Sequence, residues 1–220
     1  FLFCADNGGC PFERTRGRNL KPWDPKSYWT YDASWAQASN TPFRLYKQNQ
    51  HEGGISSPLI AHWPNGLKTK PGSITRQPAH LIDFMATFLE LGNAKYPRQA
   101  GNRVIEPLEG KSLVPIFKNA ERKGHETLYF HFGTDRALRQ GKWKLVSAKK
   151  GKWELYDMSK DRTELIDLAE KFPTKVDTMK GIWFDIAKNK ERLNQNGLSP
   201  VKGVIKELSF RKDTSNQLNN

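Results

Sequence analysis

The stretch FLFCADNGGC, residues 1–10, sets a short apolar run against Asp-Asn-Gly-Gly. Residues 1–5 are apolar at every position, which is typical of a strand buried on both faces in a parallel sheet. Asn-Gly favours positive φ, so local chemistry on its own predicts a tight turn after this strand. The position favours a second interpretation, because ligands of open α/β sheets lie outside the carboxyl ends of the strands.

The side chains at this strand end are oxygen donors. Asp6 offers a carboxylate and Asn7 an amide oxygen, and hard divalent cations such as Ca²⁺ and Mg²⁺ take oxygen ligands. Two ligands form only part of a site. The residues alone therefore leave two hypotheses open: a simple turn, or one part of a cation site.

The rest of the N-terminal half predicts an α/β arrangement. Residues 8–40 show little periodicity and many Pro, Gly, Trp and Tyr residues, which predicts a long ordered loop. A second strand is predicted at residues 58–63. Residues 78–92 then predict a helix that ends at Gly92. Its apolar stripe consists of Leu81, Ile82, Met85, Phe88 and Leu89.

The pattern changes in the C-terminal half. The runs ETLYFHF (126–132), RALRQGKWKLVS (136–147) and KWELYDM (152–158) predict a small antiparallel sheet. A helix is predicted over residues 171–192, with an apolar face of Val176, Met179, Ile182, Trp183 and Ile186. We therefore predict an α/β portion at 1–118, a small α+β subdomain at 119–194 and a polar tail at 195–220.

A second group of polar residues lies in YKQNQHEGG, residues 46–54. Lys47 carries a compact charge suited to an anionic oxygen, and the Gly pair lets backbone approach closely. For His51, a structural hydrogen bond is favoured over a general-base role beside Glu52. Glu52 is predicted to anchor the Gly turn. The other four histidines show no metal-like spacing and are predicted to be structural or exposed.

The charge of the chain excludes some classes of partner. Its net charge is +13, but acidic residues alternate with basic ones, as in KDRTELIDLAEKFPTKVD (160–177). No compact basic run has the spacing of a nucleic-acid motif, so no nucleic-acid partner is predicted. No apolar stretch approaches the roughly 20 residues of a membrane helix. The chain begins without Met inside a predicted strand, so we expect a fragment that lacks an N-terminal part.

A resemblance to a known family is carried by several strings that occur in a fixed order along the chain. They are FLFCADNGG, NTPFRLYKQNQHEGGISSPLIAHWP, HLIDFMATFLELG, LEGKSLVPIF and RALRQGKWKLV with KWELYDMSKDRTELIDLA. Together they resemble the C-terminal part of an arylsulfatase of the formylglycine-dependent sulfatase family. The resemblance implies the later part of an alkaline-phosphatase-like mixed sheet between helices, followed by a small subdomain of antiparallel sheet and helix. It also implies hydrolysis of sulfate esters, such as aryl sulfates or sulfated polysaccharides, in a periplasmic or secreted protein.

The same resemblance implies roles for three residues. Asp6 and Asn7 match ligands of Ca²⁺, which is preferred to Mg²⁺, and Lys47 matches a catalytic, substrate-binding lysine that contacts sulfate. The nucleophile of the family is a formylglycine made in a C/S-x-P-x-R motif. CPFER, residues 10–14, has Pro one place too early and follows the calcium pair, so it is not that motif. We therefore expect the nucleophile to lie upstream and this chain alone to be inactive.

Two alternatives stay open. A phosphatase or phosphonate hydrolase of the same superfold would share metal ligands at strand ends, but such enzymes use transition metals and His ligands. A non-catalytic module that binds polyanions would explain the net charge of +13. It would not explain the ordered string of sulfatase-like segments.

Overall fold

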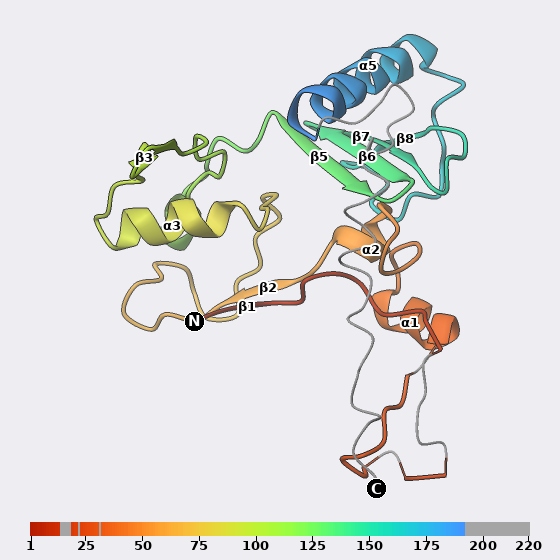
Figure 1. Cartoon of the computed structure of the whole chain (residues 1–220), viewed down its shortest axis with the longest axis horizontal. Helices are drawn as coiled ribbons and strands as arrows, with labels where there is room; N and C mark the ends of the chain where they lie inside the picture. Colours follow the sequence, from red (N-terminus) through yellow and green to blue (C-terminus); the bar gives the residue numbers. More distant parts are fainter. Residues whose placement is uncertain (14–18, 22, 31, 192–220) are drawn as a thin grey trace, which may run out of the picture. The chain divides into compact units, whose positions relative to one another are not determined.

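The computed structural model describes residues 1–13, 19–21, 23–30 and 32–191, and Figure 1 shows the elements that they form. In chain order the elements are β1 (Leu2–Cys4), α1 (Asp32–Asn40), α2 (Glu52–Ile55), β2 (Leu59–Ala61), α3 (Asp83–Leu91), β3 (Gln99–Ala100), β4 (Arg103–Val104), α4 (Val114–Phe117), β5 (Thr127–Phe132), β6 (Asp135–Gln140), β7 (Trp143–Ser147), β8 (Glu154–Asp157) and α5 (Pro173–Lys190). The predicted tail at 195–220 and the end of the predicted last helix at Arg192 lie outside the described residues.

These elements form two compact units. One contains residues 1–6 and 57–128, and the other contains the described residues of 7–56 and of the chain from 129 onward. The division differs from a single boundary near Asn119, because the described residues of 7–56 belong with the C-terminal sheet. The predicted boundary between an α/β portion and a C-terminal subdomain stays a prediction.

The C-terminal sheet has the strand order β5-β6-β7-β8, and its β6-β7 and β7-β8 pairs are antiparallel, as predicted. Two-residue loops join β5 to β6 and β6 to β7. Gly133 and Gly141 open these loops with φ of 61° and 56°, a conformation that glycine adopts without a steric penalty. The hairpins therefore follow from the alternating strand pattern and from glycine at the first loop position.

The strand register gives this sheet two different faces. Leu138 pairs with Leu145, and Leu145 pairs with Leu155, so three fully buried leucines form a row on one face. Helix α5 covers this face (Figure 1) with Met179, Trp183 and Ala187, all spaced four residues apart and buried. The predicted helix and its apolar face are confirmed. Because side chains alternate along a strand, Lys144 lies on the opposite face.

The N-terminal strand corrects the prediction. β1 pairs with β2 in an antiparallel, two-stranded sheet, with Phe3 opposite Ile60. These two side chains are 70% and 60% exposed. Strand β2 confirms the strand predicted at residues 58–63. The apolar pattern of residues 1–5 was interpreted as burial in a parallel sheet, but the pattern carries no information on strand direction, and no described element covers Phe3.

Two helices also differ from the predictions. Residues 8–40, predicted as a loop, include α1, whose first turn is stabilised by Asp32 Oδ1 accepting the N–H of Ser34 at 2.8 Å. The helix predicted at residues 78–92 is present as α3. Its buried residues are Asp83 and Thr87, whereas Met85 and Phe88 of the predicted stripe are 52% and 55% exposed. The polar side of α3 is buried because it binds residues 111–125.

Candidate functional site

The segments ADNGG and YKQNQHEGG, distant in sequence, are joined by main-chain hydrogen bonds. Gly8 N–H donates to the carbonyl of Gly54 at 3.1 Å, and Lys47 N–H donates to the carbonyl of Gly9 at 3.0 Å. The structure thus brings Asn7 and Lys47, two of the three predicted site residues, into the same compact unit.

The glycines of both strings are required by close packing of the backbone. A Cβ on Gly8 would lie 1.8 Å from the carbonyl oxygen of Gly53, and a Cβ on Gly53 would lie 2.1 Å from that of Leu45. Neither Gly8 nor Gly9 has positive φ. The tight turn that Asn-Gly predicts is therefore not the reason for these glycines, which instead allow two chain segments to approach each other.

Lys47 lies in a turn between two anchored ends. The Gly53 N–H donates to the carbonyl of Arg44 at 2.9 Å, closing the segment into a loop, and Asn49 N–H donates to the carbonyl of Tyr46 at 3.1 Å. The side chain of Lys47 is half-buried and makes no hydrogen bond or ion pair with another described residue. Its ammonium group is therefore available to an anion.

Asp6 and Asn7 come one residue after the end of β1, with Asp6 exposed and Asn7 half-buried. Neither side chain makes a hydrogen bond or ion pair with another described residue. A carboxylate and an amide oxygen with no partner among the described residues fit a hard divalent cation. Within the described part of the chain, no three His, Cys, Asp or Glu side chains form a group that could hold a metal ion. The donor set fits part of a Ca²⁺ site only.

A buried ionic cluster binds the end of the loop that carries Lys47. Lys144 Nζ lies 2.8 Å from Glu52 Oε1 and 2.8 Å from Glu164 Oε1, and the three side chains are at most 4% exposed. Glu164 Oε2 also accepts the N–H of Glu52 at 2.8 Å, at the start of α2. Arg162 at the rim lies 3.4 Å from Glu52. The prediction that Glu52 is an anchor is confirmed, and the anchor reaches the face of the sheet opposite α5.

The charge of Glu52 is stabilised by its partners. Burial alone would raise the pKa of Glu52, but the charge of Lys144 and its hydrogen bond lower it, with smaller contributions from Arg139 and Arg162. The net pKa lies below its ordinary value. Glu52 is therefore a charged structural group and not a proton donor at neutral pH.

A second group of contacts holds the ends of the loop. His51 is 1% exposed, and its Nε2 lies 3.1 Å from Glu154 Oε2. Arg44 donates to the hydroxyl of Tyr156 at 2.7 Å and to the carbonyl of Glu164 at 2.8 Å. The hydrogen bond from His51 is the main reason why the pKa of Glu154 falls to about 2, against the opposing effect of burial. His51 is structural, as predicted.

The sequence interpretation did not identify the partners Lys144, Glu154 and Glu164. Each stands among other charged residues in the sequence, which is typical of a solvated surface. One signal was present: Lys144 alternates with Trp143 and Leu145 along a predicted strand, which places it on one defined face. Glu164 has no such signal, because it lies in a loop with φ of 57°.

The other compact unit contains a buried carboxylate that serves structure. Asp83 is fully buried and binds Arg122 at 2.8 Å and His125 Nε2 at 2.6 Å. It also accepts the N–H of Lys111 at 2.8 Å. Burial would raise the pKa of Asp83, but the hydrogen bonds from Lys111 and His125, with two others, lower it. The carboxylate holds residues 111–125 against α3, and His125 is structural, as predicted.

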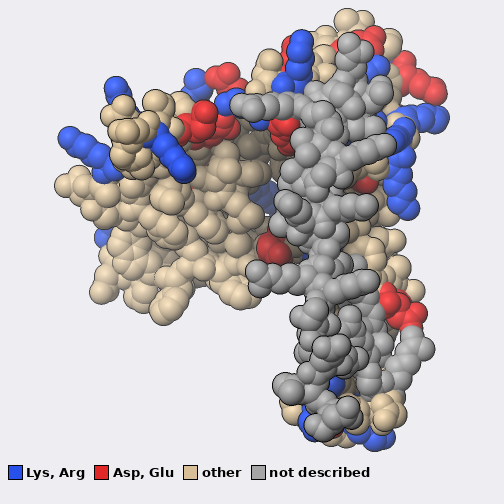
Figure 2. All heavy atoms as spheres, viewed as in Figure 1, with Lys and Arg blue, Asp and Glu red and all other residues tan. Residues whose placement is uncertain are grey.

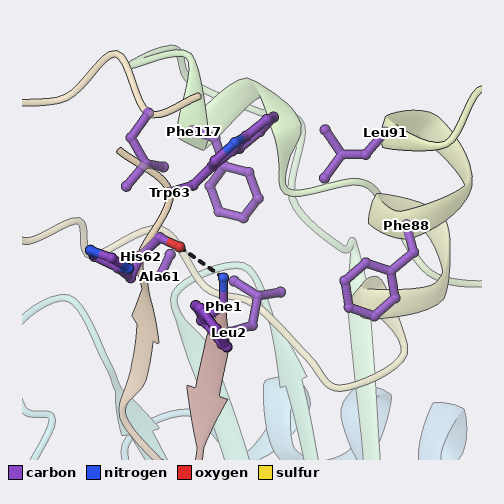
Figure 3. Close-up of a pocket in the computed structure, with 9 residues that line it drawn as sticks. Phe1, Leu2, Ala61, His62, Trp63, Phe88, Leu91 and Phe117 are labelled. Atoms are coloured by element: carbon purple, nitrogen blue, oxygen red, sulfur yellow. Dashed lines mark hydrogen bonds between the residues drawn. The ribbon is translucent and has the colours of Figure 1, made fainter. Parts of the chain in front are cut away.

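The same unit has an apolar pocket of about 370 Å³ (Figure 3). His62 is its one titratable side chain, and its carbonyl accepts a hydrogen bond from the amino group of Phe1 at 2.8 Å. The lining consists of Phe1, Leu2, Ala61, His62, Trp63, Leu67, Phe88, Leu91 and Phe117. This lining offers no pair of groups for acid-base chemistry and does not include Lys47.

Comparison with known proteins places this chain among sulfatases. Residues 43–190 match the family model described as "N-sulphoglucosamine sulphohydrolase, C-terminal". The chain is 38% identical over 111 residues to steryl-sulfatase of Mus musculus, a match that covers 50% of this chain and 16% of that protein. It is 31% identical over 106 residues to N-acetylgalactosamine-6-sulfatase of Mus musculus, covering 48% and 19%. The matches thus span less than a quarter of these relatives.

Solved structures show the same fold. The structure titled "Crystal structure of Ps i-CgsB in complex with k-i-k-neocarrahexaose" matches with a TM-score of 0.58 at 21% identity, covering 98% of this chain and 41% of that one. The mixed α/β fold with antiparallel sheets is therefore shared with this structure. Because the family model covers residues 43–190, which include Lys47, Glu52 and Lys144, the chain belongs to the sulfatase family, in which it matches the C-terminal domain.

Proposed function

We propose that this chain forms part of a sulfuric ester hydrolase in which Lys47 binds the sulfate group and Asp6 and Asn7 are two ligands of Ca²⁺. The family match supports the reaction class. The observation that carries the assignment of residues is the hydrogen bond of 3.0 Å from Lys47 N–H to the Gly9 carbonyl. It joins the loop of Lys47 to the segment that follows the Asp6-Asn7 pair.

Lys47 supplies a positive charge that is not paired with any described residue. A sulfate ester is anionic, and the hydrolysis of its S–O bond places further negative charge on the oxygens around sulfur. An ammonium group held at these oxygens stabilises this charge and orients the ester. The half-burial of Lys47 strengthens the interaction, because less solvent screens it.

Asp6 and Asn7 would hold one side of the cation. When present, Ca²⁺ offsets negative charge on sulfate oxygens, and the formylglycine, which this chain does not contain, supplies the nucleophile. The oxygen atoms of Asp6 and Asn7 carry no competing hydrogen bond from a described residue. They are therefore free to take part in such a site without loss of a structural contact.

For the substrate we propose sulfate esters of carbohydrates, with aryl sulfates as the second class. N-acetylgalactosamine-6-sulfatase and an "Ulvan-active sulfatase" from Formosa agariphila are among the relatives, at 31% and 30% identity. A sulfated sugar is also consistent with the net charge of +13. Among the described residues no helix is long and apolar enough to cross a membrane. A periplasmic or secreted location stays a prediction.

The test uses the full-length product of the gene that encodes this chain. Lys47→Ala should lower kcat/KM for sulfate esters by about 10²- to 10³-fold, as expected when a charge that stabilises the transition state is removed. Lys160→Ala is the matched control, because Lys160 is exposed in the same compact unit. An equal loss in both variants would contradict the proposed role of Lys47.

The same assay decides between this function and its alternatives. A phosphatase would release phosphate from aryl phosphates faster than sulfate from aryl sulfates. A module that only binds polyanions would show no turnover, and its binding would survive Lys47→Ala. On the face shown in Figure 2, Lys and Arg side chains occur in several separate places with Asp and Glu beside them, which gives no support to a continuous basic surface. The isolated 220-residue chain should release no sulfate.

A further inference from the structure

The loop that carries Lys47 is held from one side by the C-terminal sheet. Three side chains of the loop segment reach the sheet and the loop that follows it. Arg44 binds Tyr156 and the Glu164 carbonyl, His51 binds Glu154, and Glu52 binds Lys144. Lys47 lies between the first and second of these anchors, so its position depends on contacts made by other residues.

The anchors meet one face of the sheet. Lys144 pairs with Arg139 on one side and Tyr156 on the other, and Glu154 lies opposite Val146. Because cross-strand partners point to the same face, Arg139, Lys144, Glu154 and Tyr156 all share the face opposite α5. This face also carries an apolar cluster that includes Ala137 and Val146, but the side chains through which it binds the loop are polar or charged.

Lys144 is the centre of this arrangement. It is 1% exposed and is the one cation within 4.0 Å of both Glu52 and Glu164 among the described ion pairs. Glu164 in turn accepts the Glu52 N–H at 2.8 Å. Without Lys144 the two carboxylates would face each other in a buried site, where like charges repel strongly. They would separate, and the start of α2 would move with Glu52.

Movement at Glu52 would reach Lys47 through short backbone connections. The residue after Glu52 is Gly53, whose N–H donates to the Arg44 carbonyl at 2.9 Å, and Gly54 accepts the N–H of Gly8 at 3.1 Å. Both glycines are packed closely against the loop, since a Cβ on Gly53 would lie 2.1 Å from the Leu45 carbonyl oxygen and a Cβ on Gly54 would lie 2.0 Å from that of Asn49. A shift of α2 is therefore transmitted to both segments of the candidate site.

We propose that Lys144 is a positioning residue for Lys47, acting through Glu52 and Glu164 to hold the loop of residues 44–54 in the conformation that presents the Lys47 ammonium group to the substrate sulfate. This inference rests on the proposed function for its catalytic consequence. The part that concerns the loop itself stands on the contacts of Lys144 alone.

The experiment replaces Lys144 in the full-length gene product and measures the loop directly. In Lys144→Met, hydrogen exchange at the amides of Lys47, Gly53 and Gly54 should be faster by about tenfold or more, whereas exchange in β6 and α5 should change less than about threefold. Lys144→Arg should restore part of the protection. Lys142→Met, two residues away with an exposed side chain, is the matched control and should leave the loop unchanged.

Kinetics then test the consequence for the reaction. Lys144→Met should lower kcat/KM for a sulfate ester by about tenfold or more, because small displacements of a charge cost large factors in rate. Lys144→Arg should recover most of this loss. If Lys144→Met does not fold, Glu52→Gln takes its place, since it keeps the volume and removes only the charge. Faster exchange in the loop is again the expected result.

The outcomes separate the two proposals. Unchanged loop exchange in the folded Lys144 or Glu52 variant overturns the positioning inference whatever the activity. Faster loop exchange with unchanged kcat/KM overturns it also, since Lys47 would then not depend on the loop conformation. If the wild-type protein hydrolyses no sulfate ester, the proposed function fails, and the exchange data still decide whether Lys144 holds the loop.

Discussion

The two faces of the sheet formed by β5 to β8 differ in the contacts that they make with the rest of the unit. One face holds leucines under α5, with Trp183 and Met179 fully buried. The other, which we call the polar face, has a smaller apolar cluster that includes Ala137 and Val146, and it holds Lys144 between Glu52 and Glu164. An apolar core tolerates substitutions that keep the side-chain volume, whereas a buried charge requires a partner at a defined distance. The apolar face therefore stabilises the unit, and the polar face fixes the position of a loop.

The largest expected change in stability comes from the apolar face. Trp183→Ala removes a side chain that contacts Tyr129, Trp153 and Phe184, and it should lower the free energy of unfolding by about 3–5 kcal/mol. Denaturant titration measures this loss. Trp35→Ala is the control, because Trp35 is 67% exposed. Equal losses in the two variants would show that the apolar face is not the main source of stability.

A smaller loss is expected from the polar face. Glu164→Gln keeps an oxygen that can accept the Glu52 N–H but leaves Lys144 with Glu52 as its one full countercharge in the buried cluster. The free energy of unfolding should fall by about 1.5–3 kcal/mol, as for one charged hydrogen bond. Denaturant titration and loop exchange are measured together. A loss as large as that of Trp183→Ala would remove the proposed distinction between the faces.

The sequence predicted these two faces unequally. The periodicity of residues 171–192 predicted α5 with Met179 and Trp183 on its buried side, though not Ala187, because the apolar spacing of a helix is visible without knowledge of its partner. The same kind of pattern did not predict that β1 pairs antiparallel with β2 or that the apolar side of α3 is exposed. An apolar run does not specify which element, if any, packs against it. The sequence did not predict helix α1, because its short Ala-rich stretch stands among aromatic residues and between Pro25 and Pro42.

The candidate site shows the same limit. Asp6, Asn7 and Lys47 were predicted through resemblance to a family, and their residue types alone left a turn and a surface lysine open. The contacts that hold Lys47 join residues about 90 to 120 positions apart, such as Lys144 with Glu52 and Arg44 with Glu164. Charged residues at such separations give no local pattern, so only the fold identifies them.

The pH dependence of stability should come from the polar face. The pKa of Glu154 is lowered to about 2 in the folded chain, chiefly by its hydrogen bond to His51. A lowered pKa means that the folded state binds the proton less well than the unfolded state does. The stabilisation is therefore complete above the ordinary pKa of about 4.3 and is lost as the pH falls toward 2. Because Glu154 is partly exposed, we expect about 1–2 kcal/mol.

The measurement is the free energy of unfolding between pH 6 and the acid limit of the native state. Glu154→Gln should flatten this profile, and Trp183→Phe should shift the whole profile without changing its slope. A profile that keeps its slope in Glu154→Gln would assign the acid sensitivity to other carboxylates. Glu52 and Asp83, whose pKa values are also lowered, are the first to test.

The smallest effect is expected at the rim of the polar face. Arg162 is 44% exposed and lies 3.4 Å from Glu52, and it also donates to Ser56 at 3.1 Å. Arg162→Gln should cost about 0.5–1 kcal/mol, and the loss should shrink at high salt, because solvent and ions screen an exposed pair. The buried contact of Lys144 with the same carboxylate should not respond to salt. Equal salt dependence of the Arg162 and Lys144 variants would mean that water reaches the centre of the cluster, and a flexible loop would then replace the rigid support that we infer for Lys47.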